Sequence, residues 1–158
     1  MESASRTSGP PHASSWATPP EFYADENVVT RSVRRLLTGL GYSIHTPWEL
    51  YGARDAALGA RDEDWLERVS QRQWAILGRD LKIYERRTEL EAYEKARVQV
   101  FLLPGEGLAA ELAHLVEINL VEICTITAGR QPGTWRLTKN GLEFYEITGK
   151  RRRWPRRL

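Results

Sequence analysis

The chain has 158 residues, 41% of them hydrophobic, which suits one domain built around one core. Cys124 is the only cysteine, which excludes an intramolecular disulfide and a cysteine-rich structural zinc site and favours a cytoplasmic location. No apolar run approaches the roughly 20 residues of a membrane span and the first residues lack a signal-peptide pattern, so we expect no membrane association.

Positive charge gathers near the end of the chain. The 23 Lys and Arg against 21 Asp and Glu give a net charge of +2, but six of the cations lie within residues 150–157. Without those six, 17 cations face 21 anions, so the rest of the chain is mildly acidic. We expect residues 148–158 to form a basic tail, which either attracts phosphate or only keeps the protein in solution.

The first 20 residues are dominated by Ser, Pro, Ala, Thr and Gly and have almost no aliphatic side chains. Such a segment buries too little surface to offset the entropy lost on ordering. We therefore expect residues 1–20 to be a disordered tail and residues 21–147 to be the folded domain.

The first predicted elements are a strand, an acidic turn and a helix. Apolar residues 22–24 lead into Asp25-Glu26-Asn27, after which apolar residues recur at helical spacing up to Leu40, with Asn27 as the expected N-cap. Gly39 or Gly41 ends this helix before a second strand over residues 42–45. Residues 46–61 show no sustained periodicity and are predicted to form a long loop, which in a compact domain is often functional.

The second half of the chain repeats the alternation of helix and strand. Helices are predicted to begin at Asp62, Glu85 and Glu106, and the strands between and after them lie at residues 74–80, 98–103 and 135–137. Strands that alternate with helices are typical of an α/β domain with a largely parallel sheet and helices on both of its faces.

Three aspartates stand where such a sheet places binding sites. Asp25 and Asp80 follow strands, and Asp62 begins a helix on the same side if the preceding loop crosses the end of the sheet. Clustered carboxylates repel one another unless a cation neutralises them, and oxygen ligands suit Mg²⁺ or Mn²⁺. A water acidified by such a metal can attack a phosphodiester.

The segments around these aspartates resemble a known family. Residues 22–27, 62–66 and 74–80 (FYADEN, DEDWL and WAILGRD) look like the three acidic blocks of PIN-like domains, and the turn at residues 138–141 resembles one late in that group. The likeness covers about residues 21–147 and is greatest to the short PIN-like ribonuclease toxins of toxin–antitoxin modules.

The resemblance implies a three-layer α/β/α sandwich and a Mg²⁺- or Mn²⁺-dependent endoribonuclease that is silenced by a cognate antitoxin protein. It assigns Asp25, Asp62 and Asp80 as the metal ligands. The fuller family pattern often has a fourth acidic residue, for which the candidates are Glu26, Asp64 and Glu89. RNA would be the substrate, and a homodimer is left open.

Each proposed role has a simpler alternative. Asp25 and Asp62 can serve as helix caps, and Asp80 can be a turn residue. Arg79 and Lys82 can hold an RNA phosphate or can be solvated surface charges, and His45 can contact substrate or can be a satisfied polar residue. The alternative function is a non-catalytic PIN-like module that binds RNA or protein.

Overall fold

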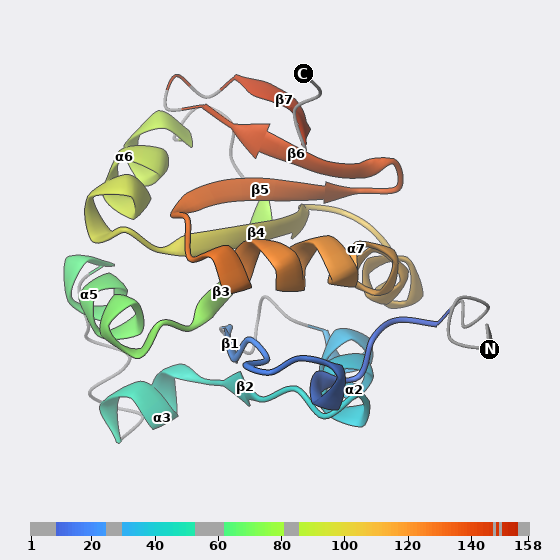
Figure 1. Ribbon diagram of the computed structural model, residues 1–158. Helices are drawn as coiled ribbons and strands as arrows, with labels where there is room; N and C mark the ends of the chain where they lie inside the picture. The colour runs from blue at the N-terminus through green and yellow to red at the C-terminus, as the bar shows by residue number, and fades with distance from the viewer. Residues whose placement is uncertain are drawn as a thin grey trace.

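The computed structural model describes residues 9–24, 30–52, 62–80, 86–146, 148 and 150–154, apart from the side chains of Asp62, Glu63 and Arg86. Within these residues the strands form one seven-stranded sheet with the order β2-β1-β3-β4-β5-β6-β7 (Figure 1). The first five strands in that order are parallel: β2 (Ile44–His45), β1 (Phe22–Tyr23), β3 (Ala75–Asp80), β4 (Gln99–Pro104) and β5 (Gly133–Thr138). The last two, β6 (Gly141–Tyr145) and β7 (Arg151–Trp154), are antiparallel additions.

Helices cover both faces of the sheet. One core cluster joins α2 (Arg31–Gly39) and α7 (Ala109–Gly129) to one face, and a second joins α3 (Pro47–Tyr51), α5 (Asp62–Arg72) and α6 (Arg86–Ala96) to the other. Neighbouring residues of β4 show the division, because Phe101 packs in the first cluster and Leu102 in the second. The predicted three-layer α/β/α class with a mostly parallel sheet is therefore confirmed.

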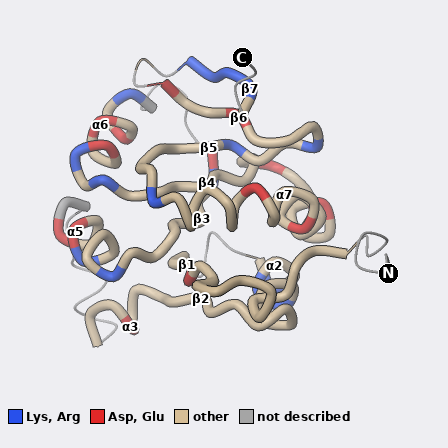
Figure 2. The backbone as a smooth tube through the Cα atoms, in the orientation of Figure 1, with Lys and Arg blue, Asp and Glu red and all other residues tan. Residues whose placement is uncertain are grey.

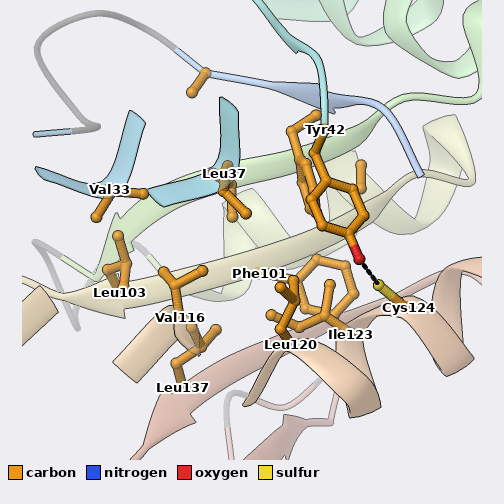
Figure 3. Packing of buried hydrophobic residues seen from close by; sticks show 14 of the residues in the cluster. Val33, Leu37, Tyr42, Phe101, Leu103, Val116, Leu120, Ile123, Cys124 and Leu137 are labelled. Carbon is orange, nitrogen blue, oxygen red and sulfur yellow. Dashed lines mark hydrogen bonds between the residues drawn. The ribbon is translucent and has the colours of Figure 1, made fainter. Parts of the chain in front are cut away.

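The longest helix is the centre of the larger cluster. Figure 3 shows Val116, Leu120 and Ile123 of α7 facing Leu37 of α2 and Phe101 of β4, and all five side chains are fully buried. Among the described residues, α7 is a helix long and apolar enough in composition to cross a membrane. Its buried face packs against the sheet and α2, whereas Ile118 and Val121 of the same helix are exposed.

The N-terminal segment is ordered from residue 9, so the prediction of a disordered tail is wrong for residues 9–20. The Ala13 amide donates to the Leu40 carbonyl, and the indole of Trp16 donates to the Tyr42 hydroxyl at 3.0 Å. That hydroxyl also donates to the Pro11 carbonyl and lies 3.5 Å from the Cys124 sulfur (Figure 3). A few aromatic and backbone contacts order a segment whose composition alone predicts disorder.

The C-terminal tail is also partly structured. Residues 151–154 form β7, in which Trp154 packs on Trp135 and Phe144 at ring separations of 5.7 and 5.3 Å. The sheet therefore continues past the predicted domain limit at residue 147, because the arginine-rich strand of the predicted basic tail pairs with β6. Strand β6 was not predicted either, although the turn predicted at residues 138–141 does join β5 to β6.

Two helix starts differ from the sequence expectation. Helix α2 begins at Arg31 with Thr30 as its cap, three residues after the predicted Asn27, which lies outside the described residues. The predicted long loop contains α3, which begins at Pro47 after a reciprocal cap: the Glu49 amide donates to the Thr46 hydroxyl, and the Thr46 amide donates to the Glu49 carboxylate. Local capping chemistry thus sets where α2 begins and accounts for α3, which apolar periodicity did not reveal.

Candidate active site

Asp80 is the last residue of β3 and lies at the carboxyl end of the parallel strands, paired in register with Pro104 of β4. Its side chain is only 5% exposed. The Tyr145 hydroxyl donates to its Oδ2 at 2.5 Å, and Arg136 Nε lies 3.6 Å from the same oxygen. A short hydrogen bond to a carboxylate is among the stronger protein contacts, so Asp80 is held in a fixed orientation.

An open hollow of about 620 Å³ lies beside this carboxylate. It is lined by Asp80, Pro104, Gly105, Glu106 and Arg136. Glu106 is exposed, and Arg136 is partly exposed at 29% of its side chain. Two carboxylates and one guanidinium therefore face one space, a combination that suits both a cation and the oxygens of a phosphate.

Arg136 has a buried hydrogen-bond donor without a partner among the described residues. Its Nε is buried, lies beyond hydrogen-bond distance from Asp80, and has no other partner within the described structure. An unpartnered buried donor costs free energy, so it persists mainly where a ligand or a water completes it.

Arg79, predicted as a substrate contact, is used by the fold. Its Nε donates to the Pro104 carbonyl and its Nη2 to the Gly105 carbonyl, both at 2.9 Å. These bonds fasten the segment that follows β4, which is one wall of the hollow. Arg79 thus supports the wall of the hollow, and its contact with a substrate phosphate stays a prediction.

Asp64 belongs to a separate group on α3 and α5. The Tyr51 hydroxyl donates to its Oδ2 at 2.7 Å, and Arg68 Nε donates to the same oxygen at 3.3 Å while its guanidinium stacks on the Tyr51 ring. The Tyr51 hydrogen bond, with a further effect of Arg68, holds the pKa of Asp64 below its usual range. These contacts give Asp64 a local role that competes with its candidacy as a fourth metal ligand.

His45 is bracketed by two carboxylates and lies away from the hollow. Its Nε2 lies 2.7 Å from Glu21 Oε1, and its Nδ1 lies 2.7 Å from Glu49 Oε2. Its ring stacks on Trp74 with a centroid separation of 3.9 Å. Both ring nitrogens and one ring face are occupied, so the satisfied-residue alternative describes His45 better than substrate contact does.

The structure leaves the predicted convergence of three aspartates untested. Asp25, Glu26 and Lys82 lie outside the described residues, as does the side chain of Asp62, which begins α5. Glu89 lies in the first turn of α6 and does not line the hollow. Among the side chains that the structure does describe, no three His, Cys, Asp or Glu gather as a metal site.

Sequence reasoning missed three residues of the hollow and its support. Glu106 follows the end of β4 and could have been found by the rule that placed Asp80, because sites lie beyond the carboxyl ends of parallel strands. Arg136 is a charge inside an apolar strand, which was a usable signal. Tyr145 lies on β6, far along the chain, and no local pattern connects it with Asp80.

Residues 20–105 match the family model for a PIN-like domain. This is more than half of the chain, and the chain therefore belongs to the PIN-like domain family, whose fold is of the nuclease type. No curated protein and no solved structure matches it.

Proposed function

We propose that the protein is a Mg²⁺- or Mn²⁺-dependent endoribonuclease whose active site is the hollow at Asp80. The observation that carries the proposal is the meeting of a buried, oriented carboxylate with Glu106 and Arg136 in one open space at the carboxyl ends of β3, β4 and β5. Membership of a family with a nuclease-type fold supports the same reading.

The donor set fits a hard divalent cation. Asp80 and Glu106 offer carboxylate oxygens, which Mg²⁺ and Mn²⁺ prefer, and Asp25 and Asp62 remain proposed as further ligands on the family resemblance. When bound, the cation would supply an acidified water and offset negative charge on the phosphate.

The chain's own residues have distinct tasks in this proposal. Tyr145 fixes Asp80 before any ligand arrives, which removes part of the cost of ordering the site. Arg136, which lines the hollow and keeps 29% of its side chain exposed, would hold a non-bridging phosphate oxygen with its guanidinium. Arg79 holds the wall of the hollow at Pro104 and Gly105.

The biological role proposed with this activity is that of a toxin that a cognate antitoxin protein silences in the cytoplasm. It rests on the likeness of the three acidic blocks to ribonuclease toxins. It predicts that induced expression of the chain alone arrests growth and that Asp80→Asn does not. Growth arrest by both proteins would reject the link between toxicity and the site.

The test of the activity is cleavage of single-stranded RNA by the purified chain in Mg²⁺ or Mn²⁺. Asp80→Asn keeps an oxygen for the Tyr145 hydrogen bond but removes the charge, and we expect cleavage to fall at least ~100-fold. The matched control is Glu91→Gln, which removes an exposed α6 carboxylate whose partner is Arg87 and should leave cleavage unchanged. Equal cleavage by wild type and Asp80→Asn would reject the proposal. Absence of cleavage with RNA binding that survives chelator would favour the non-catalytic module.

A further inference from the structure

The opposite end of the sheet, here called the amino end, carries a group of arginines. Helices α5, α6 and α7 finish where β3, β4 and β5 begin, and Arg72, Arg97 and Arg130 lie at those three helix ends. Figure 2 shows basic segments at these three helix ends along the left side of the view. Neighbouring strands are about 4.8 Å apart and Arg97 and Arg130 line the same hollow, so the three helix ends bring the arginines to one end of the sheet.

The backbone at these helix ends is unusual. Gln73, Arg97 and Arg130 all have positive φ, at 59°, 59° and 57°. Glycine is the usual residue there, because a side chain in the left-handed region costs free energy. At two of the three ends the chain has an arginine instead. Backbone strain of this kind is found mainly at functional positions.

The arginines are exposed and not neutralised. Arg97 and Arg130 form no ion pair or hydrogen bond through their side chains within the described residues, and Arg72 contacts only the Arg68 carbonyl and the Trp74 ring. Glu94 lines a hollow next to Arg97, but no ion pair joins the two. Arg97 and Arg130 share an open hollow of about 240 Å³ with Ser70, Gln73, Trp74 and Gln99.

We propose that the amino end of the sheet binds the sugar-phosphate backbone of single-stranded RNA through Arg72, Arg97 and Arg130. Unneutralised guanidiniums at three separate helix ends match a linear polyanion better than a compact anion. The Trp74 ring already contacts His45, Tyr23 and Arg72, so we assign the RNA contact to phosphates and not to stacked bases. The bound segment lies at the end of the strands remote from Asp80, which makes this a second contact for a long RNA.

The inference rests on the proposed function only in taking RNA as the ligand. Binding is therefore measured in the Asp80→Asn protein with chelator present, where cleavage cannot interfere. Wild-type protein that fails to cleave, with binding that still depends on the arginines, would end the proposed function and leave this inference standing. Cleavage by wild type, with RNA binding that does not depend on the arginines, would reject this inference and leave the proposed function in place.

The decisive variant is Arg97→Gly with Arg130→Gly, measured by fluorescence anisotropy against an RNA of about 16 nucleotides. Two lost phosphate contacts should make the negative slope of log affinity against log salt shallower by about 1.4. If the two proteins bind equally at about 1 M salt, this change weakens binding roughly 25-fold at about 0.1 M salt. The thermal midpoint should stay the same or rise by a few degrees, because glycine relieves the left-handed backbone.

Two further variants separate binding from helix capping. Gln73→Gly relieves the same backbone geometry on α5 without removing a charge, so it should raise the thermal midpoint and leave RNA affinity unchanged. Arg97→Gln with Arg130→Gln keeps long side chains at the caps and should show the same loss of affinity; it also serves if the glycine variant fails to fold. Wild-type affinity and salt slope in the double variants would overturn the inference, as would an equal loss of affinity in Gln73→Gly.

Discussion

The two ends of the sheet differ in how their charges are balanced. At the carboxyl end Asp80 is buried, bonded to Tyr145 and faced by Arg136, whereas at the amino end Arg97 and Arg130 are exposed and meet no carboxylate within the described residues. A buried, oriented charge is costly to build and suits chemistry that needs fixed geometry. Exposed cations suit the binding of a polyanion, which depends on electrostatic attraction and not on fixed geometry. This difference is the basis on which we propose chemistry at one end and RNA retention at the other.

The largest expected effect comes from the guanidinium of Arg136 in the Asp80 hollow. Arg136→Met keeps much of the side-chain volume but removes the charge and the unpartnered donor, and we expect RNA cleavage to fall by ~10²–10³. Arg136→Lys should restore part of the rate, because it returns the charge without the fork of donors. Cleavage assays on folded protein check this. A wild-type rate in Arg136→Met would remove the distinction between the two ends.

The next effect concerns the hydrogen bond that orients Asp80. Tyr145→Phe leaves a nearly buried carboxylate without its phenol donor, so we expect the free energy of unfolding to fall by about 1.5–3 kcal/mol. Urea unfolding of both proteins measures the difference. An unchanged unfolding free energy would mean that the carboxyl end is no more tightly built than the exposed amino end.

Both ends depend on the core that the N-terminal segment covers, and this core should be sensitive to alkali. Burial raises the pKa of the Cys124 thiol to about 11, and burial also raises the pKa of Tyr42 well above its usual value. The unfolded chain loses the thiol proton near pH 8.5 while the folded chain keeps it, so stability falls as pH rises from about 8.5 towards 11. The slope should approach ~1.4 kcal/mol per pH unit for each group.

Urea unfolding at several alkaline pH values checks this expectation, and Cys124→Ala should flatten the part of the curve nearest pH 9. A native thiol that reacts with an alkylating reagent as fast as an unfolded one at pH 8 would contradict the burial of Cys124.

The smallest effect is expected at Asp64, the exposed counterpart of Asp80. Tyr51→Phe removes the main cause of its low pKa, so the pKa should rise towards the ordinary value. The lowered pKa contributes to folding stability above about pH 4, and this contribution is lost as pH falls through the pKa of the folded state. The variant should therefore be less stable than wild type above about pH 4 and equally stable at lower pH. A titration of the Asp64 carboxyl by NMR measures the shift. No change on removal of the phenol would assign the low pKa to Arg68 alone.

The sequence predicted the fold class and the place of Asp80 at the carboxyl end of a strand, because strand and helix periods are local and parallel strands put their carboxyl ends together. It did not predict β6 and β7, since arginines in β7 resemble a solvated tail until Trp154 is seen to pack on Trp135. The order of residues 9–20 depends on Tyr42, whose hydroxyl accepts a hydrogen bond from the Trp16 indole and donates one to the Pro11 carbonyl. Both bonds join residues that are far apart in the sequence. The bond of Tyr145 to Asp80 spans 65 residues, and long-range contacts of that kind leave no local pattern.

The most direct measurement of the central claim is Mn²⁺ binding to the RNA-free protein, followed by electron paramagnetic resonance. The account predicts that wild type takes up Mn²⁺ at a site that Asp80→Asn loses, while Arg97→Gly with Arg130→Gly retains it. Equal uptake by wild type and Asp80→Asn, or no uptake by either, would contradict the assignment of a divalent cation to the carboxyl end of the sheet.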